Sequence, residues 1–151
     1  MATALYDKAR EAFASFSSAG LAAAIDLETD TIRVCLVKAA YVPDLVNHQF
    51  FTSLGANVVG NAGGATRGDC PALAGKAVDG TGLFNATDAT ISLVPAGAGV
   101  CNEVALFKDT GADATSPLIC LIDNATGLPV TPGGGNITIE WDNGLFLIFK
   151  L

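Results

Sequence analysis

The chain has 151 residues, half of them apolar and only 15% charged, and its formal net charge is −7. This length is typical of one domain with a full hydrophobic core, and the composition argues against a disordered chain. The acidic balance, without a cluster of lysine or arginine, argues against nucleic acid or an anionic membrane surface as the main partner. We therefore expect a single domain over residues 1–151 that binds neither nucleic acid nor membrane.

The first predicted element is a helix over residues 3–16. Apolar side chains recur there at helical spacing, Thr3 can cap the first turn, and Asp7 lies near the positive end of the helix dipole. The segment ends in a Ser-Ser-Ala-Gly run, and the sequence leaves open whether residues 21–25 form a further helical turn or a loop.

About eight short strands are predicted after this helix, separated by turns rich in Gly, Asn and Asp. The runs 101–107 and 118–122 are almost continuously apolar, which is typical of strands buried on both faces. Short strands without intervening helices favour a sandwich or jelly roll. The predicted fold is therefore mainly β, a β-sandwich or jelly roll over residues 30–151 with one N-terminal α-helix. The predicted strands are 31–37, 50–59 with a break near Gly55, 73–78, 89–94, 101–107, 118–122, 136–142 and 145–151.

The C-terminal stretch carries the strongest local signal. Polar and apolar residues alternate from Asn136 to Asp142, and Asn143-Gly144 fits the type I′ turn of a β-hairpin. The run 145–151 is apolar on both faces, so we expect it to lie inside a sheet or against a partner. The sequence thus predicts a C-terminal hairpin.

Cysteine and histidine suggest packing rather than chemistry. His48 is the only histidine, and we interpret it as a loop or strand-start residue hydrogen-bonded to backbone rather than as a catalytic base. The four cysteines lack the spacing of a zinc site. Cys35, Cys101 and Cys120 fall in apolar runs and are expected to be buried thiols, whereas Cys70, in a Gly-rich loop, is the one expected to be exposed.

The acidic residues form no constellation that indicates catalysis or metal binding. The segments 109–113 and 123–127 resemble calcium loops only faintly, and turn chemistry explains their Asp, Asn and Gly equally well. The N-terminus lacks the basic-then-apolar order of a signal peptide. We therefore expect no enzyme activity, no cofactor and no metal, and synthesis in the cytoplasm.

Several segments resemble a family of small tailed-bacteriophage virion proteins. They are 5–13 (LYDKAREAF), 30–37 (DTIRVCLV), 48–50 (HQF), 107–111 (FKDTG), 115–119 (TSPLI) and 123–151. The most specific piece is 125–144, ATGLPVTPGGGNITIEWDNG. The similarity covers nearly the whole chain and is weakest over residues 52–104; residues 14–27 and Phe146-Leu147 depart from the family pattern. These departures leave open which virion surface the protein contacts.

The resemblance implies a structural protein that decorates and stabilises a phage capsid, as a cement protein does. The implied partners are the major capsid protein and further copies of the chain, and the implied location is the capsid surface after synthesis in the host cytoplasm. The alternative is a carbohydrate- or receptor-binding β-sandwich on the virion or tail surface. The candidate assembly contacts are apolar residues of the helix and the last strand, unless both elements pack in the protein's own core. These residues are Tyr6, Phe13, Phe16, Phe146 and Ile148.

Overall fold

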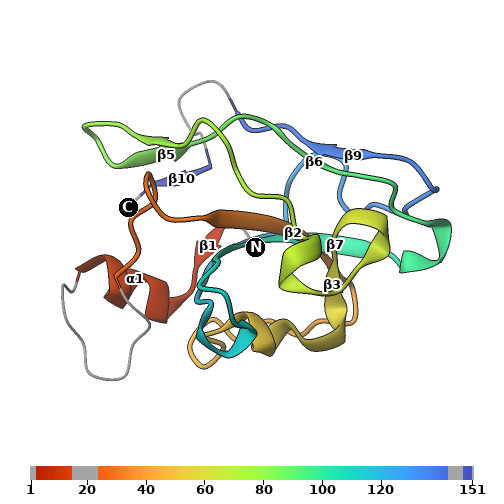
Figure 1. The fold of residues 1–151 in the computed structure, drawn as a ribbon, viewed down its shortest axis with the longest axis horizontal. Helices are drawn as coiled ribbons and strands as arrows, with labels where there is room; N and C mark the ends of the chain where they lie inside the picture. The colour runs from red at the N-terminus through yellow and green to blue at the C-terminus, as the bar shows by residue number, and fades with distance from the viewer. Residues whose placement is uncertain (1–2, 15–23, 143–147, 151) are drawn as a thin grey trace.

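The computed structural model describes residues 3–14, 24–142 and 148–150. Within these ranges the protein is mainly β with one α-helix, which confirms the predicted class, while the sandwich or jelly-roll arrangement stays a prediction. The strands form three antiparallel sheets of five, three and two strands. The five-stranded sheet crosses the middle of the molecule, and the two smaller sheets lie above it in Figure 1.

The five-stranded sheet has the order β1-β8-β7-β2-β3. Its centre is the pair β2 and β7, in which Val34 lies opposite Leu106 and Leu36 opposite Val104. Both strands, and β8 beside them, are buried on both faces, because their sequences are almost continuously apolar. These three strands confirm the predictions at 31–37, 101–107 and 118–122. The bounds are β1 Ala4–Leu5, β2 Ile32–Lys38, β3 Val58–Val59, β7 Cys101–Lys108 and β8 Leu118–Ile122.

Each of the two smaller sheets pairs a C-terminal strand with a strand that is far away in the sequence. The three-stranded sheet has the order β10-β5-β4, and β6 pairs with β9 in the two-stranded sheet. Strand β5 was not predicted from the sequence, and β4 and β6 are shorter than the predicted 73–78 and 89–94. The bounds are β4 Ala77–Val78, β5 Leu83–Asn85, β6 Ala89–Ile91, β9 Ile137–Ile139 and β10 Phe149–Lys150.

The sequence predicts that segments 136–142 and 145–151 pair with each other as a C-terminal hairpin, and this pairing is wrong. Strand β9 pairs with β6, Ile137 opposite Ile91, whereas β10 pairs with β5, Phe149 opposite Phe84. The arms therefore belong to different sheets, because tertiary pairing with distant strands outweighs the local turn signal. Asn143-Gly144 itself lies outside the described residues.

The N-terminal helix is shorter than predicted. Residues 4–5 form β1 on the edge of β8, and α1 spans Asp7–Ala14. The turn into α1 is fixed by the Tyr6 N–H, which donates to the Ile119 carbonyl at 3.0 Å. The helix buries Ala9 and Ala12 and lies beside β8 at the lower left of Figure 1.

Short 3₁₀ turns replace part of the predicted β structure. The predicted strand 50–59 is wrong except for β3, since η1 occupies most of it and contains Gly55 at a φ of 56°, which a strand does not accommodate. Two further turns, η2 and η3, lie between residues 61 and 69. The bounds are η1 Phe51–Asn57, η2 Asn61–Gly63, η3 Arg67–Asp69, η4 Ala96–Ala98 and η5 Asp113–Thr115.

Candidate assembly surface

The described candidate contacts from the sequence lie mostly inside the protein. Tyr6 and Ile148 are buried in the core, and Phe13 is partly buried, with its ring centroid 6.4 Å from that of Phe149. Phe16 and Phe146 lie outside the described residues. For Tyr6 and Ile148 the assignment as surface contacts is corrected: they pack in the protein's own core, the alternative that the sequence left open.

The structure instead points to the loop of residues 41–48, whose base is fixed by a buried chain of hydrogen bonds. The Tyr41 hydroxyl lies 3.1 Å from the Tyr6 hydroxyl and 2.6 Å from Nδ1 of His48. The Asp44 N–H also donates to this Nδ1, so the ring nitrogen acts as an acceptor. The Tyr41 O–H therefore donates to His48, and the Tyr6 O–H donates to Tyr41.

Backbone bonds hold the rest of this loop. The Asp44 carboxylate accepts from the N–H groups of Val46 and Asn47, and the His48 N–H donates to the Asp44 carbonyl. The Leu45 carbonyl accepts from the Asp7 N–H at the start of α1, at 2.9 Å. The loop is thus tied to the helix and to itself, and His48 has the bonded loop role that the sequence suggested, with a tyrosine as its main partner.

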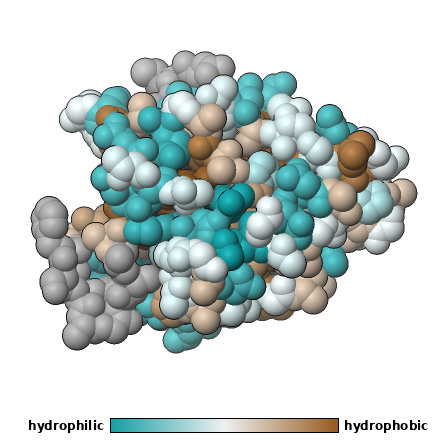
Figure 2. Space-filling view, viewed as in Figure 1, coloured by the Kyte–Doolittle hydropathy of each residue, from teal (hydrophilic) through white to brown (hydrophobic). Residues whose placement is uncertain are grey.

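This anchored loop presents two apolar side chains to solvent. Val42 is 78% exposed and Val46 is 61% exposed. The other exposed large apolar side chains among the described residues, Leu93 and Val100, lie elsewhere in the sequence. On the face drawn in Figure 2 hydrophilic surface predominates and apolar surface is confined to small areas. Two exposed valines on a fixed loop are suited to contact with another protein. Sequence periodicity missed them because they lie in a connection between elements.

Beneath the same region lies a buried carboxyl, Glu103 of β7. Its side chain is 6% exposed, and its Oε2 has no hydrogen-bond partner among the residues described. Burial, reinforced by the nearby Asp123 charge, raises the pKa of Glu103 to about 7. The charge of Glu103 in turn helps to raise the pKa of Tyr6 and Tyr41, for which burial is the largest cause.

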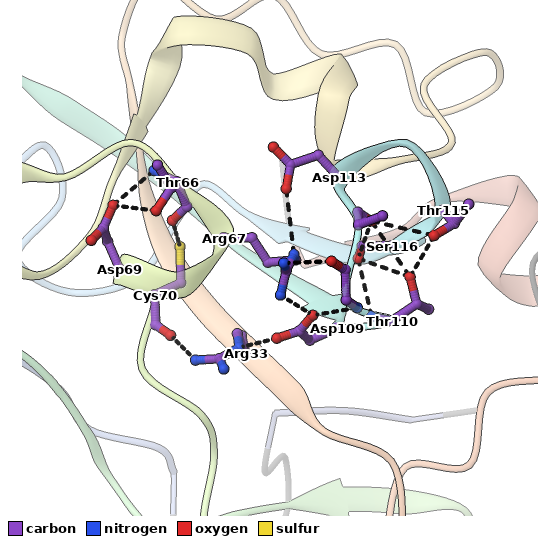
Figure 3. A network of polar contacts seen from close by, with 12 residues as sticks. Arg33, Thr66, Arg67, Asp69, Cys70, Asp109, Thr110, Asp113, Thr115 and Ser116 are labelled. Carbon is purple, nitrogen blue, oxygen red and sulfur yellow. Dashed lines mark hydrogen bonds and ion pairs between the residues drawn. The ribbon is translucent and has the colours of Figure 1, made fainter.

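A second polar cluster lies where β2, η3 and the β7–β8 loop meet (Figure 3). The Asp109 carboxylate accepts from Arg33 Nε at 2.5 Å and from an Nη atom of Arg67. Arg33 also donates to the Cys70 carbonyl at 2.6 Å, and Arg67 to the Gly111 carbonyl at 2.7 Å. Through these bonds one carboxylate joins three segments that are distant in sequence.

Asp109 is held in its ionised form. Burial opposes ionisation, but the Gly111 N–H and the guanidinium groups of Arg33 and Arg67 outweigh it, so the pKa of Asp109 is lowered. Since both carboxylate oxygens already bind guanidinium groups, the segment 109–113 is explained as an ion-paired turn rather than a calcium loop. Arg67 begins an Arg-Gly-Asp tripeptide whose Asp69 accepts from the Thr66 N–H and hydroxyl, so both charged side chains of the tripeptide serve the fold.

A groove of about 810 Å³ lies between β9 and the segment that follows β8. Apolar side chains such as Val104 and Ile122 line it together with the polar side chains of Asn124, Thr126 and Glu140. Trp141 also lines the groove, but it is 6% exposed and its indole N–H donates to the Thr87 carbonyl. Among the described residues that line it, the groove therefore offers polar partners and apolar walls without a protruding aromatic side chain.

Over the described ranges, 3–14, 24–142 and 148–150, no group of three His, Cys, Asp or Glu side chains is placed to hold a metal ion. None of the described helices is long and apolar enough to cross a membrane. Comparison with protein-family models gives no match to this chain, and comparison with curated proteins gives none either.

Proposed function

We propose that this chain is a virion structural protein of a tailed bacteriophage, which decorates and stabilises the capsid shell through protein–protein contacts. Its partners are the major capsid protein and further copies of itself on the capsid surface, and its role is structural rather than enzymatic. The observation that carries the proposal is the loop 41–48, which is rigidly anchored yet exposes Val42 and Val46.

Physical chemistry supports this use of the loop. A partner that covers two exposed valines gains the free energy of removing apolar surface from water. Because Tyr41, Asp44 and His48 already fix the loop, little conformational entropy is lost when it binds. The sequence resembles small virion proteins, most specifically over residues 125–144. This resemblance is our reason for proposing a capsid as the partner.

The test is binding of the purified protein to capsids that lack it, followed by cosedimentation and cryo-electron microscopy. We expect Val42→Asp with Val46→Asp to weaken binding by ten-fold or more, about 1.4 kcal/mol or greater, since two charges would then be buried without partners. Leu93→Asp is the matched control, because Leu93 is 66% exposed on a different segment. If the loop variant and the Leu93→Asp control lose capsid binding equally, the loop is not part of the interface. If the chain is absent from virions, the proposal as a whole is wrong.

A second candidate is carbohydrate or receptor binding, which the groove beside β9 favours. Asn124, Thr126 and Glu140 offer the amide, hydroxyl and carboxylate groups that bind sugar hydroxyls, over apolar walls. The buried Trp141 weakens this candidate, since sugar sites usually expose an aromatic face. A glycan array decides it: binding that Thr126→Ala and Glu140→Ala abolish supports it, whereas an array without binding rejects it.

A further inference from the structure

On the side of β2 that faces β3, the residues before Leu36 are partly covered by a segment that is not a regular strand. Arg33 and Ala72 form an isolated antiparallel bridge. The Leu73 N–H donates to the Ile32 carbonyl at 2.8 Å, and the Val34 N–H donates to the Pro71 carbonyl at 3.1 Å. These bonds flank the Arg33–Ala72 pair, which makes it a non-hydrogen-bonded pair of an antiparallel ladder.

Extending this register by two residues would place Cys70 opposite Cys35. Residues two apart on a strand share a face and the same type of pairing, so this is again a non-hydrogen-bonded position, where side chains approach most closely. The Cα separation at such positions, about 4.5 Å, lies within the range that disulfides span. Next to Cys70, the Asp69 backbone packs directly against Gly60, which follows β3.

Contacts of the two thiols agree with this placement. The neighbouring Cys70 side chain, together with burial, raises the pKa of Cys35 well above its usual value. The Cys70 thiol itself donates to the Thr66 carbonyl at 3.4 Å. Both residues are fully buried, which corrects the sequence expectation that Cys70 is exposed. Arg33 fixes the Cys70 backbone by donating to its carbonyl, as Figure 3 shows.

We propose that Cys35 and Cys70 are a covalent cross-linking site that closes to a disulfide when the protein is oxidised. One thiolate attacks the sulfur of a small disulfide oxidant such as oxidised glutathione, which releases one glutathione thiolate and leaves a mixed disulfide. The second thiolate attacks the protein sulfur of that mixed disulfide and releases the second glutathione. The two protein thiols lose two protons and two electrons, and the oxidant is reduced to two thiols.

The cross-link would join the two ends of the segment 35–70, which contains the loop 41–48. It closes a loop of about 35 residues, which constrains the unfolded state and raises the melting temperature by about 10 °C. Because both thiols are buried and Cys35 is protonated at neutral pH, the reaction proceeds through transient opening of the 70–73 segment and accelerates as pH rises.

The test is refolding of the full chain in a glutathione redox buffer, followed by non-reducing proteolysis and mass spectrometry. We expect one major cross-linked peptide that joins Cys35 to Cys70, an intact mass lower by two hydrogen atoms, and a melting temperature that falls when a reductant is added. The variants Cys101→Ser and Cys120→Ser are controls and keep the cross-link, whereas Cys35→Ser and Cys70→Ser lose it.

Mapping of the natural chain needs no variant, so a variant that fails to fold does not obscure the result. A major linkage through Cys101 or Cys120 would overturn the proposal. So would four free thiols after refolding under oxidising conditions, or an oxidised form that melts below the reduced one.

Discussion

Two clusters of polar side chains lie along β7, one at each end. Near its start Glu103 lies close to Tyr6 and Tyr41, and just after its end Asp109 receives Arg33 and Arg67. The Asp109 carboxylate is satisfied on both oxygens and its pKa is lowered, whereas one oxygen of Glu103 has no hydrogen-bond partner in the described part of the chain and its pKa is raised. Burial is similar for both, so the presence of cationic donors decides which charge state the fold accepts.

The largest expected effect is loss of the ionised cluster. Asp109→Ala leaves Arg33 and Arg67 without their shared carboxylate, and we expect the free energy of unfolding at pH 7 to fall by about 3 kcal/mol, measured by urea denaturation. The lowered pKa means that the stabilisation is present above the usual Asp pKa of about 3.9 and is lost as pH falls through the folded-state value. The difference between variant and natural chain should therefore shrink in acid. A constant difference down to pH 2 would contradict this account.

Glu103→Gln should act in the opposite direction. The raised pKa of about 7 means that the folded state is favoured at low pH, and that this contribution is lost as pH rises from about 4.5 through 7. We expect the variant to be more stable than the natural chain by about 2 kcal/mol at pH 8 and equal to it at pH 4 and below, where the carboxyl is protonated in both the folded and the unfolded state. Urea denaturation from pH 4 to pH 8 checks that the two stabilities separate as pH rises, and a variant that is less stable at pH 8 would refute this account.

A smaller effect is expected at the hydrogen-bond chain beside Glu103. Tyr41→Phe removes the acceptor of the fully buried Tyr6 hydroxyl, which should cost about 1 kcal/mol. The double variant with Tyr6→Phe leaves no unpaired hydroxyl, so it should recover part of that loss. If the two losses simply add, Tyr6 does not depend on Tyr41 as its partner.

The smallest effect is expected where charges are exposed. The Lys8–Glu11 pair on α1 has a separation of 2.8 Å, similar to the buried pairs, but both side chains are well exposed. Glu11→Ala should therefore change the free energy of unfolding by less than about 0.5 kcal/mol in the same urea assay. A loss comparable to that of Asp109→Ala would show that burial is not what separates the clusters.

The central strands could be predicted from sequence because their apolar runs carry the information locally. The pairing of β9 and β10 could not, since their partners β6 and β5 lie far away in the chain and the Asn143-Gly144 signal favours a local hairpin. Asp109 was read as a turn residue for the same reason: Arg33 and Arg67 are 76 and 42 residues away. Val42 and Val46 escaped notice because exposure is a tertiary property.

In the loop 41–48, the residues whose side chains hold the loop in place differ from the residues whose side chains face solvent. Tyr41, Asp44 and His48 supply its side-chain hydrogen bonds, so replacements at 42 and 46 leave that framework intact. Substitutions at these two sites should therefore change the exposed surface of the loop without changing its fold. The same sites are suited to attaching a fluorophore or displaying a short foreign peptide.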